Sequence, residues 1–172
     1  MCLNGRVSMK IFNVIIIFFC FSFYSLASVD VIGITINKDD KADVYHKYEI
    51  VSEENNKLIL NPKDVQLDGV IDVMVALKDD KVKAVLLTLE KNRFDYFYKI
   101  LKSKYKLVEE EIPYVGDRYA LFDKDGIGIF LDSRHLSSNV FLSYMDKEYK
   151  NEIIKKKREQ DKNKMEHDVN QL

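Results

Sequence analysis

The chain has 172 residues, and its 27 Lys and Arg residues nearly balance its 28 Asp and Glu residues, for a net charge of −1 at pH 7. This balance does not favour nucleic acid or an anionic membrane as a partner, because both attract a basic surface. The only cysteines are Cys2 and Cys20, so the rest of the chain cannot form a disulfide or offer thiolate ligands to zinc.

The N-terminal segment has the layout of a secretory signal peptide from Met9 onward. Lys10 supplies the positive region, Val14–Phe21 the apolar run, and Ser25-Leu26-Ala27 before a small residue the cleavage signal. We therefore expect cleavage after Ala27 or Ser28 and a periplasmic or secreted protein. The bias towards Lys, Asn and Ile agrees with a bacterial source.

An uncleaved membrane anchor is the alternative, but the apolar run is shorter than the about 20 residues of a membrane span. Either Met1 or Met9 can be the start. Removing residues 1–28 takes away two basic residues and no acid, which leaves a chain of net charge −3 without cysteine. We expect residues 29–150 to form one domain held by its apolar core, and residues 151–172 a charged helical tail.

The first predicted elements are short. Residues 29–36, VDVIGITI, are rich in β-branched side chains and predict a strand. Asp39 or Asp40 is the expected N-cap of a brief helix. Residues 49–60 predict two strands around a turn at Asn55–Asn56.

A hairpin and a longer helix follow. Residues 71–77 alternate between apolar and polar types, which is typical of a half-buried strand, and the turn KDDK at 78–81 leads into a second strand at 82–90. Asn92 is the expected N-cap of a helix at 93–104, whose aromatic face would pack on the sheet.

The last part of the domain predicts three more strands. RYALFD at 118–123, IGIFLDS at 127–133 and NVFLSYM at 139–145 most simply form an antiparallel meander. From Asp146 the pattern becomes helical, and residues 155–164 contain no apolar side chain.

Two segments of the chain share one pattern. ITINKDDKADVYHKYEIV and LTLEKNRFDYFYKILKSKYKLV both place Thr at a strand end, then an aromatic helix, then Lys-Tyr and a β run. The second copy is longer by four residues between Thr and Tyr, about one helical turn. We predict two tandem strand-helix-strands repeats; chance similarity in a Lys- and Tyr-rich chain is the alternative.

This arrangement resembles the tandem repeat fold of the β-lactamase inhibitor protein and of related small outer-membrane assembly lipoproteins. The segment LKSKYKLVEEEIPYVGDRYALF, with the strands after it, is also similar to uncharacterised small secreted bacterial proteins. The chain departs from the inhibitor proteins in lacking their disulfides, and from the lipoproteins in lacking a lipid-bearing cysteine. The resemblance implies a fold and assigns no functional residue.

The sequence Asp-Lys-Asp-Gly at 123–126 has half the pattern of a calcium loop. With Gly126 at the sixth position, Asp123 and Asp125 fit, but Leu121 occupies the first position, where an oxygen ligand is needed. The flanks alternate like strands, so we predict a β-turn with a positive φ at Gly126.

The remaining motifs are weak. Gly128 completes only a Gly-x-Gly, opens a strand, and more simply marks a bulge or a close contact. Asp132, His135 and Ser137 or Ser138 have the residue types of a hydrolase triad but share one polar loop. The basic run KKKR at 155–158 is interleaved with acids and predicts a solvated helix face. The acidic run Glu109 to Glu111 either meets a basic partner or lines a strand end.

We therefore predict an α+β fold in which an antiparallel sheet carries helices on one face, followed by a C-terminal helix. The expected role is a periplasmic protein-binding module, such as an inhibitor, immunity or envelope-assembly protein, with no cofactor, metal or catalytic centre. Its interaction surface is predicted at Tyr119, Phe130, Tyr144 and His135. A binding protein for a small molecule or glycan is the alternative, and a hydrolase using the 132–138 loop is the third hypothesis.

Overall fold

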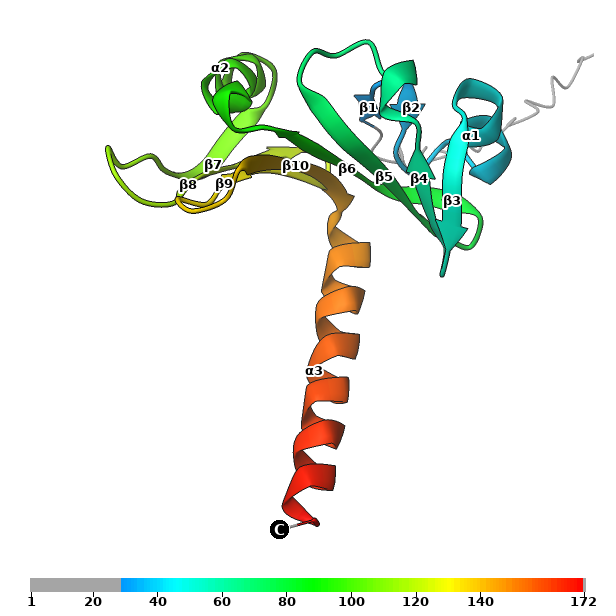
Figure 1. Ribbon diagram of the computed structural model, residues 1–172. Helices are drawn as coiled ribbons and strands as arrows, with labels where there is room; N and C mark the ends of the chain where they lie inside the picture. The colour runs from blue at the N-terminus through cyan, green and yellow to red at the C-terminus, as the bar shows by residue number, and fades with distance from the viewer. Residues whose placement is uncertain (1–28, 172) are drawn as a thin grey trace, which may run out of the picture.

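The computed structural model describes residues 29–171, and the predicted signal peptide therefore lies outside the described residues. The fold is α+β, as predicted, and is built on one antiparallel sheet of eight strands in the order β3-β4-β5-β6-β10-β9-β8-β7 (Figure 1). The strands are β3 (Ile50–Glu54), β4 (Lys57–Leu60), β5 (Val70–Lys78), β6 (Lys81–Glu90), β7 (Lys106–Glu111), β8 (Arg118–Lys124), β9 (Ile127–Ser133) and β10 (Asn139–Asp146).

The sheet consists of two similar halves. Helix α1 (Lys41–Lys47) precedes β3 to β6, helix α2 (Phe94–Lys104) precedes β7 to β10, and both helices lie on the same face of the sheet (Figure 1). The helices have 7 and 11 residues, which is the predicted difference of four. Tyr48 and Tyr105 occupy equivalent positions in the two halves, since each is the C-cap of its helix and donates its backbone N–H to the last turn. The repeated unit is a helix followed by four strands, and β6 pairs with β10 at the centre.

The prediction of one strand at 29–36 is wrong. The chain turns back on itself between β1 (Asp30–Val31) and β2 (Ile34–Thr35), which form a separate two-stranded sheet. Ile32 and Gly33 take φ values of 51° and 78° in this turn, and the Asp30 carboxylate accepts a hydrogen bond from the Gly33 N–H. The reversal buries the apolar side chains on both arms, which an extended strand would not.

Asp40 caps α1, as one of the two predicted alternatives. Its carboxylate accepts from the Asp43 N–H and the Asp43 carboxylate accepts from the Asp40 N–H, which is a capping box. Before α2, however, Asn92 lies inside a 3-10 turn, η2 (Lys91–Arg93). The prediction of Asn92 as the N-cap of α2 is therefore wrong. Arg93 precedes the helix instead, with its guanidinium 4.4 Å from the Tyr96 ring centroid.

The predicted turns are found at the three hairpins. Both central residues of each turn have positive φ, namely Asn55 and Asn56, Asp79 and Asp80, and Asp125 and Gly126. A turn of this kind matches the right-handed twist of the flanking strands. Gly128 pairs regularly with Asp123 and Met145, so the predicted bulge there is wrong. A side chain at Gly128 would meet only ordinary contacts.

The apolar core lies between the sheet and the helices on one face. The 3-10 turn η1 (Pro62–Asp64) and the β1–β2 hairpin cover part of this face next to α1. The largest fully buried side chains come from both halves and from the hairpin: Ile34, Ile36, Leu58, Leu60, Leu87, Leu89, Phe94, Leu101, Phe122, Ile127, Ile129 and Leu131.

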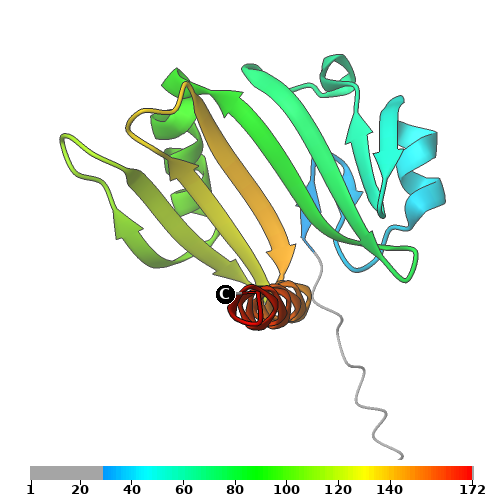
Figure 2. The same cartoon turned by 60° about the horizontal axis from the view of Figure 1, so that its bottom comes forward.

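Helix α3 (Lys147–Val169) leaves the sheet at the end of β10 and projects away from it (Figures 1 and 2). Its N-cap is Asp146, which accepts from the Tyr149 N–H, and Glu152 pairs with Lys78 at 2.6 Å. None of its residues 147–169 is buried. A helix of this length extends about 35 Å into solvent. Among residues 29–171, no helix combines the length and apolar character that a membrane crossing requires.

Candidate binding surface

The face of the sheet opposite α1 and α2 is the candidate binding surface, and we call it the open face. Residues paired directly across antiparallel strands point to the same side, so the strand register arranges the side chains of this face in rows. Two of these rows hold its aromatic residues. The first row contains Asp72, Thr88, Phe141, Asp132, Tyr119 and Glu111. The second row contains Ile59, Met74, Leu86, Ser143, Phe130, Leu121 and Glu109.

The open face exposes large apolar side chains at its centre. Phe130 and Phe141, on the neighbouring strands β9 and β10, are 36% and 42% exposed. Tyr119 lies against Phe130 with ring centroids 5.9 Å apart. Phe141 is the diagonal neighbour of Phe130 in the register of β9 and β10, so the three side chains lie in one region of the face, which we call the aromatic patch. Exposed aromatic side chains are typical of protein interfaces.

Acidic side chains surround this aromatic patch. Both rows end in glutamates on β7, Glu109 and Glu111, and the first row also carries Asp72 and Asp132. These two rows contain no Lys or Arg, although the exposed Arg134 side chain approaches Asp132 to 3.5 Å. The next row on the same face runs from Lys57 on β4 to Lys106 on β7, so the negative charge is confined to the two rows that hold the aromatic residues.

A hydrogen bond fixes one aromatic ring of the patch to the acidic border. The Tyr119 hydroxyl donates to the Glu109 carboxylate at 2.6 Å. This bond, together with partial desolvation, raises the pKa of Tyr119. The bond joins the aromatic patch to its acidic border.

The four predicted interaction residues do not form one surface. Tyr119 and Phe130 lie together on the open face, but Tyr144 is paired with Ile129 and points to the helix side, where it is buried beside Tyr105. His135 lies in the loop after β9, and its backbone N–H donates to Asp117. Tyr144 follows Ser143, the residue of β10 that pairs with Phe130, and successive residues of a strand alternate between faces, so Tyr144 cannot share a surface with Tyr119 and Phe130.

Phe141 and the acidic border were missed by the sequence reasoning. Phe141 is the outward residue of a strand whose neighbours Val140 and Leu142 are buried, so the alternation of NVFLSYM contained the signal. The signal for the acidic border was the run Glu109 to Glu111. The sequence allowed this run either to meet a basic partner or to line a strand end. Only the pairing of β7 with β8 places Glu109 and Glu111 on the open face.

The 132–138 loop does not bring the three triad types together. Asp132 contacts Arg134, and the Ser137 hydroxyl bonds to the backbone of Asn139. Among residues 29–171 no hydrogen bond joins the side chains of Asp132, His135 and either serine. This arrangement gives no support to a hydrolase at the loop.

The Asp-Lys-Asp-Gly turn is occupied by ion pairs. Asp123 approaches Lys147 to 2.8 Å and Asp125 approaches Lys124 to 2.8 Å. Within the described part of the chain, no three His, Cys, Asp or Glu side chains are placed to hold a metal ion together.

Comparison with protein families, curated proteins and solved structures finds no match to this chain.

Proposed function

We propose that the protein acts as an exported binding module that holds a basic partner protein on the open face of its sheet. The observation that carries the proposal is the patch of Tyr119, Phe130 and Phe141 with its acidic border. Exposed aromatic side chains inside a charged border supply both the buried centre and the polar rim of a protein interface.

The size of the open face suits this role. Six neighbouring strands of the sheet, in the order β5-β6-β10-β9-β8-β7, lie about 4.8 Å apart and are about seven residues long. They span roughly 24 Å by 24 Å. This area of roughly 600 Å² approaches the about 800 Å² that each partner contributes to a standard interface. Residues at the base of α3 can supply the remainder.

Charge supports a basic partner. The two rows that hold the aromatic residues carry Glu109, Glu111, Asp72 and Asp132, and oppositely charged surfaces speed association and select partners. The signal-like N-terminal sequence supports a periplasmic site of action.

Site-specific photo-crosslinking in intact cells tests the proposal. A photoreactive residue at Phe130 or at Phe141 should capture the same protein. The matched control is Tyr96, which is 50% exposed on α2 on the other side of the sheet and should not capture it. Glu109→Lys combined with Asp132→Lys should abolish the crosslink from Phe141.

Capture of that protein equally well from Tyr96, or crosslinks that survive the charge reversal, would contradict the proposed surface. Export is tested separately by mass spectrometry of the protein from the periplasmic fraction. We expect an N-terminus at Ser28 or Val29, and an intact chain in the cytoplasm would contradict export.

A further inference from the structure

Strand β7 forms one edge of the eight-stranded sheet, and its only neighbour in the sheet is β8. An edge strand leaves every second backbone N–H and C=O group without a strand partner, and an added strand can pair with these groups. Among residues 29–171, no backbone group of β7 forms a backbone hydrogen bond to any element other than β8. The outer side of β7 therefore offers a row of backbone donors and acceptors beside the aromatic patch.

Three unpaired charges of this edge lie on the open face. Lys106, Glu109 and Glu111 point to the open face because their partners on β8 do. Within the described part of the chain none of the three forms an ion pair, and only Glu109 has a side-chain hydrogen bond, from the uncharged Tyr119 hydroxyl. A bulge at Val108 separates the base from the two acids.

The helix-side glutamate of β7 is already held by α2. The Tyr98 hydroxyl donates to the Glu110 carboxylate, and Lys102 Nζ lies 3.5 Å from this carboxylate. The charges that an added strand meets without a partner are therefore those on the open face.

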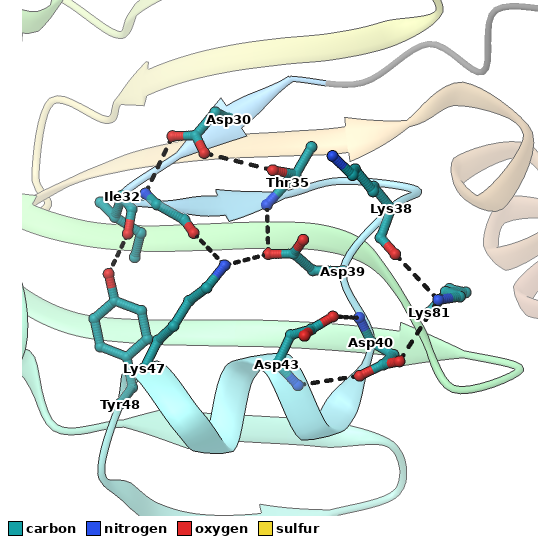
Figure 3. Close-up of polar contacts among 11 residues, drawn as sticks. Asp30, Ile32, Thr35, Lys38, Asp39, Asp40, Asp43, Lys47, Tyr48 and Lys81 are labelled. Carbon is teal, nitrogen blue, oxygen red and sulfur yellow. Dashed lines mark hydrogen bonds and ion pairs between the residues drawn. The ribbon is translucent and has the colours of Figure 1, made fainter.

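The other edge of the sheet, β3, has the same helix-side contacts but a different open face. The Tyr45 hydroxyl and Lys41 Nζ donate to the Glu53 carboxylate at 2.7 and 2.6 Å. Helix α1, which carries both donors, is held by its capping box and by polar contacts to the β1–β2 hairpin (Figure 3). On the open face β3 carries Ser52 and Glu54, which is one acid where β7 has two. Strands β4, β5 and β6 also separate β3 from the aromatic patch.

We propose that the basic partner adds a strand to β7, antiparallel to it, with bases opposite Glu109 and Glu111 and an acid opposite Lys106. This inference rests on the proposed function, because the added strand extends the two rows of the open face that hold the aromatic residues. Pairing of the main chains supplies affinity, and the alternate side chains on the open face supply specificity.

The same charges disfavour a second copy of β7 as the added strand. Two antiparallel copies can set Lys106 against Glu111, but this register sets Glu109 against Glu109, and like charges directly opposite each other are destabilising. A bulge also hinders the pairing of two edges. Light scattering should therefore find the full chain to be a monomer. A dimer that Glu111→Lys dissociates would assign the edge to a second copy and overturn the proposal.

A peptide with blocked ends and the central sequence Lys-Val-Lys-Val-Glu is the probe, titrated into the full chain by calorimetry. Glu111→Lys should weaken binding by about fivefold or more, because an exposed ion pair is exchanged for a repulsion. The control Glu54→Lys makes the same charge change on the open face of β3 and should leave the affinity unchanged. A peptide with glutamate in place of its first lysine should bind the Glu111→Lys variant better than the parent.

Methylation of the peptide backbone tests the pairing of main chains. Methyl groups on the nitrogens of every second residue remove the N–H groups along one side of an extended peptide. Methylation of the side that faces β7 should abolish binding, and methylation of the other side should leave it. Hydrogen exchange of the β7 amides should slow when the unmethylated peptide binds, while exchange of the β3 amides should not change.

Two methylated peptides that bind alike, or no binding of the parent peptide, would overturn strand addition at β7. Capture of one protein in cells from Phe130 and Phe141, together with either of these results, would show that the partner uses the open face and not the edge. Absence of capture from both positions would instead contradict the proposed function itself.

Discussion

Replacing Asp39 with alanine should lower the free energy of unfolding by about 2 kcal/mol, the effect of losing charge-assisted hydrogen bonds at a buried site. The side chain is only 11% exposed and accepts from the Thr35 N–H at 3.1 Å and from Lys47 Nζ at 2.6 Å. The substitution leaves the part-buried Thr35 N–H without its partner and removes one of the contacts that join α1 to the β1–β2 hairpin. For a chain of this size, about 2 kcal/mol corresponds to a fall in Tm of roughly 4–8 °C.

The pKa of Asp39 determines how its contribution to the free energy of unfolding changes with pH. Burial alone would raise the pKa of Asp39, but the hydrogen bond from Lys47, with that from Thr35, outweighs it and lowers the pKa below its ordinary value of 3.8. A carboxyl group with a lowered pKa in the folded state stabilises the fold above its unfolded pKa and stops doing so as the pH falls through the folded value. The stability difference between the parent and Asp39→Asn should therefore be constant near pH 7 and shrink below about pH 4.

Urea unfolding followed by circular dichroism, at pH 7 and through the acid range, measures both effects. The control is Lys41→Ala, which breaks the Lys41–Glu53 pair, whose side chains are 37% and 36% exposed. This change should cost less than about 1 kcal/mol. Equal losses in Asp39→Ala and Lys41→Ala, or a difference between the parent and Asp39→Asn that does not change with pH, would refute the reasoning.

Three further predictions separate the parts of the fold. Phe122→Ala should cost about 3–5 kcal/mol because Phe122 is fully buried under α2, whereas Phe130→Ala on the open face should cost less than about 1 kcal/mol; equal costs by urea unfolding would contradict the assignment of faces. Deleting residues 155–172 should change Tm by less than about 2 °C, since this part of α3 buries nothing, and a larger fall in calorimetry would show hidden packing. Gly126→Ala should lower the free energy of unfolding by about 1 kcal/mol because φ is 83° there, while Gly128→Ala, which meets only ordinary contacts, should cost less by the same urea assay.

Short-range features of this fold could be read from the sequence because a few neighbouring residues decide them. Asp40 with Asp43 caps α1, and Asn55–Asn56 and Asp125–Gly126 turn the chain between strands. The alternation of residues 71–77 marks a strand of the sheet. In each case the side chain or backbone preference acts within four residues.

Tertiary structure decided which side chains meet. Alternation separates the two faces of each strand, but only the pairing of β10 with β6, some 50 residues earlier, puts Phe141 beside Thr88 on the open face and Leu142 beside Leu87 on the helix side. The sequence could group Tyr119, Phe130 and Tyr144 as aromatic residues, yet it could not divide them between opposite faces. Such choices depend on register between distant strands, which is set by the packing of the whole core and not by local preference.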